Sequence, residues 1–256
     1  MVDLTRYGLM SVGAAISTML IKGLAAWLTN SVGLWSDAAE SLVNLVAAIV
    51  AVITLKVAIR PPDDSHPFGH SKAEYFSAIV EGVMIFVAAG VIIYTAVMRI
   101  INPVMPEQLG VGLLISVGAS LINGGVAVVL LRAGGRHRSA TLVADGRHLM
   151  TDVITSAAVL IGVGLVALTH LQVLDPIVAL LAGLNILYTG WNLIRHSVDG
   201  LMDTALPVDL TGRLTTVLDE HRADGIAFHA IRTRESGHRR FMEFHVLVPD
   251  DWTVKQ

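Results

Sequence analysis

Six long hydrophobic stretches, separated by short polar segments, account for most of the chain. Each is about as long as the roughly 20 apolar residues that an α-helix needs to cross the hydrocarbon core of a bilayer. Turn-forming sequences such as Arg60-Pro61-Pro62 and Gly134-Gly135 stand between them. The pattern predicts an all-α, six-helix transmembrane domain over residues 1–205, with spans at about 8–28, 32–55, 75–99, 109–131, 141–168 and 176–194.

The pattern changes after residue 205. Hydrophobic residues within 207–223 recur at helical spacing, which predicts an amphipathic helix. Residues 226–234 and 240–248 have the composition of two strands, and the Glu-Ser-Gly-His-Arg turn between them predicts a hairpin. Together they predict a small α+β domain over residues 206–256. One helix and one hairpin bury little surface, so we interpret this domain as truncated.

The composition indicates a membrane protein. Of all residues, 54% are hydrophobic and 15% are charged, whereas soluble domains carry about 25% charged residues. The net charge of −3 gives no reason to expect a nucleic-acid partner. The absence of cysteine excludes disulfides and thiolate ligands, and the ten histidines favour imidazole and carboxylate coordination if a metal binds.

Lysine and arginine residues gather in alternate connections between the predicted spans. Basic residues flanking the spans usually mark the cytoplasmic side of a membrane. We therefore expect both termini and the two basic connections to be cytoplasmic, with the protein in the cell (inner) membrane. The basic residues concerned are Lys56, Arg60, Lys72, Arg132, Arg136, Arg138 and Arg195.

Two of the predicted spans carry acids, an amide and a histidine at helical spacing. Residues three, four and seven positions apart share one face of a helix. A charge at the bilayer centre costs roughly 2.5–3.5 kcal/mol on insertion scales, and protonation or a bound divalent cation would relieve that cost. The residues are Asp37, Glu40 and Asn44 in the second span, and Asp145, His148 and Asp152 in the fifth.

These stripes predict a metal site inside the membrane. Two helices that each supply a pair of ligands can surround a divalent ion with nitrogen and oxygen atoms. Asp37 and Asp145 lie one turn away, and we expect them to orient the ligands. The alternative is that the whole set only forms hydrogen bonds between helices. The predicted ligands are Glu40, Asn44, His148 and Asp152.

Two further groups of candidate ligands lie outside the predicted spans. Asp63, His66 and His70 are close in sequence in the connection between the second and third spans. His229 and His245 lie on the two predicted strands, where cross-strand neighbours could share a metal ion. The alternative for both groups is that the side chains are simply solvated and bind no metal ion.

Four stretches, taken together, resemble the cation diffusion facilitator family of metal efflux transporters. They are S-V-G-L-W-S-D-A-A-E-S-L-V-N (31–44), R-P-P-D-D-S-H-P-F-G-H-S-K-A-E (60–74), A-D-G-R-H-L-M-T-D (144–152) and G-L-M-D-T-A-L-P (200–207). The resemblance runs over nearly the whole chain. It implies a homodimeric secondary transporter, not an enzyme, which exports a divalent metal ion in exchange for protons.

The resemblance also implies residue assignments. The family's transport site maps to the four ligands predicted above, its loop site to Asp63, His66 and His70, and its ferredoxin-like cytoplasmic domain to the helix and hairpin, with His229 and His245 at ligand positions. A charge interlock at the family's dimer interface maps to Lys72 and Asp203.

The resemblance bears on the metal as well. Many zinc-transporting members have Asp or His where this chain has Glu40, and Asp where it has Asn44. Zinc is the expected ion, with iron, manganese, cobalt and cadmium as alternatives.

Two other classes of protein stay open at this point. An intramembrane metalloenzyme would use Glu40 or Asp152 as general base, with His148 on a hydrolytic metal. The chain lacks the H-E-x-x-H pair that would favour such an enzyme. A non-transporting metal sensor would instead depend on the cytoplasmic histidines.

Overall fold

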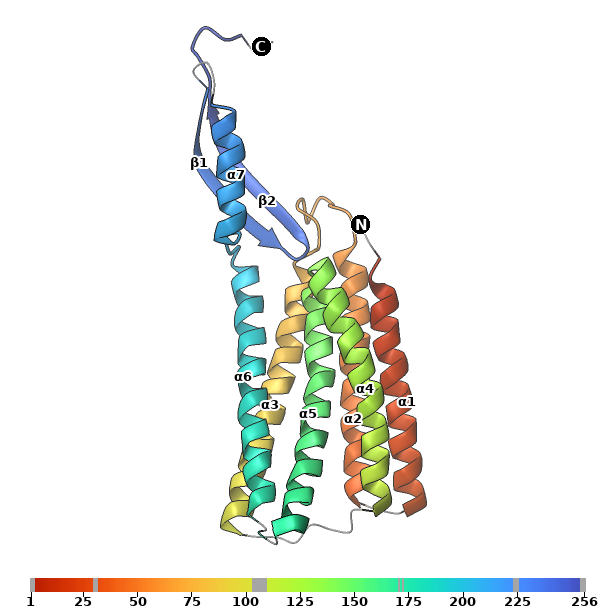
Figure 1. The fold of residues 1–256 in the computed structure, drawn as a ribbon. Helices are drawn as coiled ribbons and strands as arrows, with labels where there is room; N and C mark the ends of the chain where they lie inside the picture. Colours follow the sequence, from red (N-terminus) through yellow and green to blue (C-terminus); the bar gives the residue numbers. More distant parts are fainter. Residues whose placement is uncertain are drawn as a thin grey trace.

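The computed structural model describes residues 3–29, 32–102, 110–169, 171, 173–222 and 226–253. It has a bundle of six long helices and, beyond one end of the bundle, a small unit of one helix and a β-hairpin (Figure 1). The bundle helices are α1 (Thr5–Thr29), α2 (Val32–Ala58), α3 (Ala73–Ile101), α4 (Gly110–His137), α5 (Ala140–Thr169) and α6 (Leu174–Leu201). The small unit comprises α7 (Val208–Glu220), β1 (Ala227–Ser236) and β2 (Arg239–Leu247).

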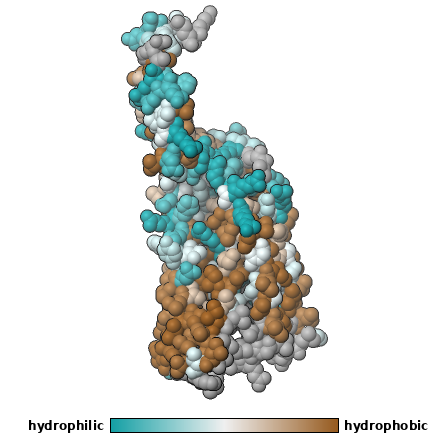
Figure 2. Space-filling view, in the orientation of Figure 1, coloured by the Kyte–Doolittle hydropathy of each residue, from teal (hydrophilic) through white to brown (hydrophobic). Residues whose placement is uncertain are grey.

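Four helical segments within the described part of the chain are long and apolar enough to cross a membrane. They are Thr5–Leu24, Ala73–Ile101, Val117–His137 and Pro176–Leu201. Figure 2 shows hydrophobic residues over the lower part of the bundle and hydrophilic residues over its upper end and the small unit. The prediction of a mostly helical membrane protein with a small sheet is therefore confirmed, whereas the count of six spans stays a prediction.

Small residues let the bundle helices approach one another closely, as is common in membrane proteins. At Gly82 of α3, an added Cβ would lie 2.8 Å from the side chain of Ile194 in α6. At Gly190 of α6, it would lie 3.0 Å from the backbone nitrogen of Phe86. Helices α3 and α6 therefore pack at short range. The other two extensively packed helix pairs are α1–α2 and α4–α5.

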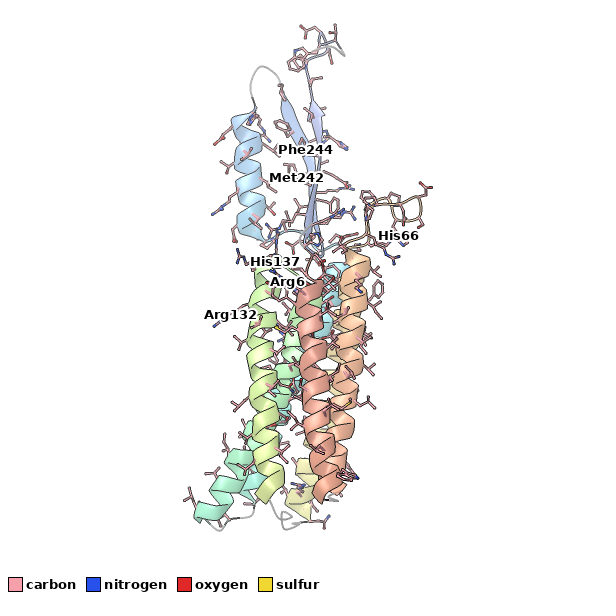
Figure 3. The ribbon with its side chains drawn as sticks, turned by 90° about the vertical axis from the view of Figure 1, so that its right-hand side faces the viewer. Arg6, His66, Arg132, His137, Met242 and Phe244 are labelled. Carbon is pink, nitrogen blue, oxygen red and sulfur yellow. The ribbon has the colours of Figure 1, made fainter. Side chains whose placement is uncertain are left out.

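The small unit is an amphipathic helix packed on an antiparallel hairpin. Strands β1 and β2 pair from Ala227 with Leu247 to Ser236 with Arg239, and the register shifts between His229 and Arg232. The predicted strands differ from these bounds by one or two residues at each end. Figure 3 shows Met242 on the hairpin beside α7. Met242 and residues of α7 line the same cavity.

The turn of the hairpin rests on the end of the bundle (Figure 1). The backbone N–H of Gly237 donates to the hydroxyl of Tyr75 in α3 over 3.0 Å. The hydroxyl oxygens of Ser71 and Ser236, both buried, lie 3.2 Å apart. Gly237 has φ +56°, a conformation that glycine adopts without steric cost. These contacts connect the small unit directly to the start of α3.

Candidate metal site

Helices α2 and α5 meet at a buried polar contact made of three of the predicted ligands. Asn44 of α2 is 5% exposed and His148 of α5 is 7% exposed. The Asn44 amide nitrogen donates to Asp152 Oδ2 over 2.6 Å, and its amide oxygen lies 2.8 Å from His148 Nε2. His148 and Asp152 are four residues apart, so one face of α5 presents both to α2. The structure thus brings these three side chains together.

Glu40, the fourth predicted ligand, lies in α2 one helical turn before Asn44. Its side chain and that of Asp37 are outside the described residues. The helical backbone puts Glu40 on the face of α2 that carries Asn44. Its role as a ligand, and that of Asp37 beside it, stay predictions.

Asn123 of α4 completes the contact and was not among the residues predicted from the sequence. Its amide nitrogen donates to Asp152 Oδ2 over 3.2 Å, so that oxygen accepts two amide N–H groups. Asn123 is 4% exposed. A signal was present in the sequence, because Asn123 is the only amide side chain within residues 109–131. Spacing within one helix could not reveal that it faces α5.

Two more acids are buried inside the bundle near this contact. Asp145 of α5 is 1% exposed and accepts a hydrogen bond of 3.0 Å from the hydroxyl of Ser11 in α1. Glu81 of α3 is fully buried and accepts one of 3.3 Å from Ser77. Among the described residues, Asp145 Oδ2 and Glu81 Oε2 have no hydrogen-bond partner. Acids inside a membrane bundle are costly and usually functional, and the expected function of Asp145 is to orient the predicted ligands.

The interior polar groups form an arrangement suited to a cation. Carboxylate and amide oxygens and an imidazole nitrogen are the usual ligands of divalent transition metals in the absence of thiolates. Protons and metal ions compete for the same lone pairs on these atoms. The chemistry that this arrangement supports is therefore reversible binding of a cation that protonation opposes.

Asp63, His66 and His70 form a second cluster, in the loop between α2 and α3 that Figure 3 shows beside the end of the bundle. One ligand atom from each residue lies within 4.8 Å of the others. Asp63 Oδ1 is 3.4 Å from His66 Nδ1, and Asp63 Oδ2 is 3.4 Å from His70 Nε2. Contraction of these distances would place three ligands on one ion. The structure therefore brings together all the residues predicted for the loop site.

The charge on Asp63 is stabilised by its own loop. Its carboxylate accepts hydrogen bonds from the hydroxyl and backbone of Ser65 and from the backbone N–H of His66, at 2.8, 3.0 and 2.7 Å. The Ser65 bonds and then the His66 bond lower the pKa of Asp63 from 3.8 to about 2. The carboxylate is thus charged and available to a cation throughout the physiological range of pH.

His229 and His245 are directly paired across the hairpin. Both are exposed, and their ring centroids are 4.9 Å apart with the rings nearly perpendicular. The pairing that the sequence suggested is present. Two imidazoles form half of a four-coordinate site.

Lys72 and Asp203 form an ion pair within one chain. Lys72 Nζ lies 2.9 Å from Asp203 Oδ1, and Arg234 of the hairpin lies 3.2 Å from the same oxygen. The hydrogen bond from Lys72, followed by that from Arg234, lowers the pKa of Asp203. The pair connects the start of α3 to the end of α6, and Arg234 extends the connection to β1.

Comparison with known proteins identifies two matching regions. Residues 9–202 match the family described as the cation efflux transmembrane domain, and residues 206–256 match the cytoplasmic domain of cation efflux proteins. An uncharacterized transporter of Synechocystis sp., sll1263, is 47% identical over 98% of this chain and 81% of its own length.

Bacterial pumps are also similar to this chain. The cation-efflux pump FieF of Citrobacter koseri is 30% identical over 93% of this chain and 79% of the pump. The FieF pump of Klebsiella pneumoniae is 27% identical over 98% of this chain and 83% of the pump. The similarity spans both matching regions.

Proposed function

This chain belongs to the cation diffusion facilitator family of cation-efflux transporters, and on that premise we propose that it exports zinc across the cell membrane in exchange for protons. Membership of the family makes it a multi-pass membrane transporter of divalent metal cations and not an enzyme. One observation carries the finer proposal. The buried side chains of Asn44 and His148 and the partly buried side chain of Asp152 meet at the interface between α2 and α5.

The site couples metal to protons because both need the same atoms. Ligating carboxylates must be ionised and a ligating imidazole must be neutral, so bound metal and bound protons exclude each other. A site open to the near-neutral cytoplasm loads metal with Glu40, Asn44, His148 and Asp152. A site open to a more acidic exterior takes up protons and releases the metal.

Alternating exposure requires α2 and α5 to move relative to their neighbours. Secondary transporters commonly expose a fixed midplane site to each side in turn by rocking of helix groups. Helix α5 forms side-chain hydrogen bonds with two other helices, because Asp152 accepts one from Asn123 of α4 and Asp145 accepts one from Ser11 of α1. Motion of α5 therefore changes several buried polar contacts together.

The regions outside the membrane support the proposal in a second way. The loop cluster of Asp63, His66 and His70 offers a cytoplasmic metal site close to the start of α3. The cytoplasmic domain family matched by residues 206–256 supports a homodimer, with Lys72 and Asp203 securing the bundle near that interface. Both termini lie at the bundle end with the small unit (Figure 1), which we place in the cytoplasm.

Transport by reconstituted protein tests the proposal. Proteoliposomes with an imposed pH gradient are loaded with a fluorescent zinc indicator, and the internal pH is followed in parallel. Asp152→Ala and His148→Ala should abolish zinc-driven proton flux, because each removes one of the proposed metal ligands. His221→Ala, on the exposed residue after α7, is the matched control and should transport normally.

Folding must be checked separately from activity. Size-exclusion profiles and helical circular dichroism should be the same for all four proteins. Full transport by both site variants would reject the assignment of the site. Zinc flux that is independent of the pH gradient would reject proton exchange while leaving metal efflux intact.

A further inference from the structure

Asn123 is an unusual residue for its place in the bundle. It is 4% exposed, and no charged residue occurs within 110–131 of α4. A buried amide without hydrogen bonds is costly, and most strongly so where water is absent. One half of this amide is satisfied, because its nitrogen donates to Asp152 Oδ2 over 3.2 Å. Among the described residues, its oxygen has no hydrogen-bond partner.

A purely structural role does not account for this arrangement. An amide that holds two helices together gains most when both its nitrogen and its oxygen are bonded. Rotation of the Asn123 amide by half a turn exchanges the two atoms without changing its shape. Either orientation leaves one polar atom unsatisfied beside Asp152. The Asn123 side chain therefore keeps one polar atom that could still bind another group.

Two amides converge on one carboxylate oxygen. Asp152 Oδ2 accepts from Asn44 over 2.6 Å and from Asn123 over 3.2 Å. A cation that binds this oxygen takes the place of an N–H donor. The longer and weaker of the two bonds is that of Asn123. Once released, the Asn123 amide can turn its oxygen, a neutral ligand, towards the same point.

We propose that Asn123 is a third-helix member of the transport site, which positions Asp152 and then supplies an amide oxygen to the transported ion. The inference rests on the proposed function, because it takes Asp152 to be a ligand. It adds α4 to the two helices that supply the predicted ligands. It also gives the site more oxygen atoms than a four-coordinate ion requires.

The extra oxygen has a consequence for selectivity. Zn²⁺ is satisfied by four ligands and accepts nitrogen readily. Mn²⁺ prefers oxygen ligands in a six-coordinate arrangement. Asn123 therefore favours the larger, oxygen-preferring divalent ions over zinc, and its removal narrows the range of ions that the site accepts.

The test compares Mn²⁺ and Zn²⁺ in three variants. Asn123→Leu keeps the approximate volume and removes the amide, and Asn123→Asp retains an oxygen ligand. Asn185→Leu makes the same change at an exposed position of α6 and is the matched control. Half-saturating concentration and maximal rate are measured in proteoliposomes. Binding is measured separately on purified protein, by electron paramagnetic resonance for Mn²⁺ and calorimetry for Zn²⁺.

Asn123→Leu should weaken Mn²⁺ binding and transport by about 10- to 100-fold, the usual effect of losing a residue that supports a metal ligand. Zn²⁺ affinity should fall less, so the ratio of the two changes. Asn123→Asp should restore Mn²⁺ affinity, which a loss of packing would not allow. Asn185→Leu should match the unaltered protein for both ions.

Other results would overturn the proposal. Unchanged affinity for both ions in Asn123→Leu, together with inactive His148→Ala, removes Asn123 from the site and leaves the proposed function standing. If Asn123→Leu loses affinity for Mn²⁺ and Zn²⁺ equally, and Asn123→Asp does not recover it, Asn123 has only a structural role. If Asn123→Leu does not fold, Asn123→Ala takes its place, because it also removes the amide, and an unchanged ratio of Mn²⁺ to Zn²⁺ affinity in that variant overturns the proposal.

Discussion

Replacement of Gly237 by alanine should detach the hairpin turn from the bundle. Gly237 has φ +56°, and its backbone N–H donates to the Tyr75 hydroxyl over 3.0 Å. A Cβ at this position would lie 2.8 Å from the carbonyl oxygen of Ser71. Because the obstacle is backbone, the turn itself must move. That movement separates Gly237 from Tyr75 and Ser236 from Ser71.

The size of the effect follows from these contacts. A left-handed conformation costs a residue with a Cβ about 1–2 kcal/mol. Each lost hydrogen bond between buried groups removes about 0.5–1.5 kcal/mol. The docked position of the turn should therefore be destabilised by about 2–5 kcal/mol, which exceeds the roughly 1.4 kcal/mol that changes an equilibrium tenfold.

Hydrogen exchange and limited proteolysis of the detergent-solubilised protein measure the docking. Amides around Gly237 should exchange faster and protease should cleave β1 or β2, while exchange within α3 and α5 stays slow. Gly212→Ala is the control, since a Cβ there meets nothing within 4 Å and alanine favours the helix by roughly 0.5–1 kcal/mol. Protection of the turn that is the same in Gly237→Ala and Gly212→Ala would refute the docking contact and its energy.

Two further predictions concern the candidate metal sites outside the helix bundle. The folded-state pKa of Asp63 is about 2, below its ordinary 3.8, so the loop gains stability from the charged form above pH 3.8 and loses it as the pH falls through 2. A carbon NMR titration of the Asp63 carboxyl should have its midpoint near 2, and a midpoint near 3.8 would contradict the hydrogen bonds described here. His229→Ala with His245→Ala should reduce the number of bound metal ions but leave transport under saturating zinc unchanged, as metal counting and vesicle flux would show. If the unaltered protein transports no metal and the double variant loses the response to metal, the result would instead favour a metal sensor.

The local features of this protein could be read from its sequence. Helices α1 to α6 follow from long apolar stretches, and the bounds of β1 and β2 follow to within two residues from composition and the turn between them. The loop cluster was predicted because Asp63 and His70 are only seven residues apart, so a tight turn necessarily brings them near. His148 and Asp152 were predicted to share a face because helical periodicity dictates it.

Contacts between helices could not be read in the same way. Which elements lie side by side decides three contacts: that of Asn123 with Asp152, that of Ser11 with Asp145 and that of Gly237 with Tyr75. Apolar helices are nearly interchangeable in lipid, because lipid tails attract them as well as other helices do, and the pattern of hydrophobic residues does not encode the neighbour. The sequence by itself determined the elements and which candidate ligands share a face of one helix. Only the tertiary packing, set by close approach at small residues and by buried hydrogen bonds, decided that α4 joins α2 and α5 around Asp152.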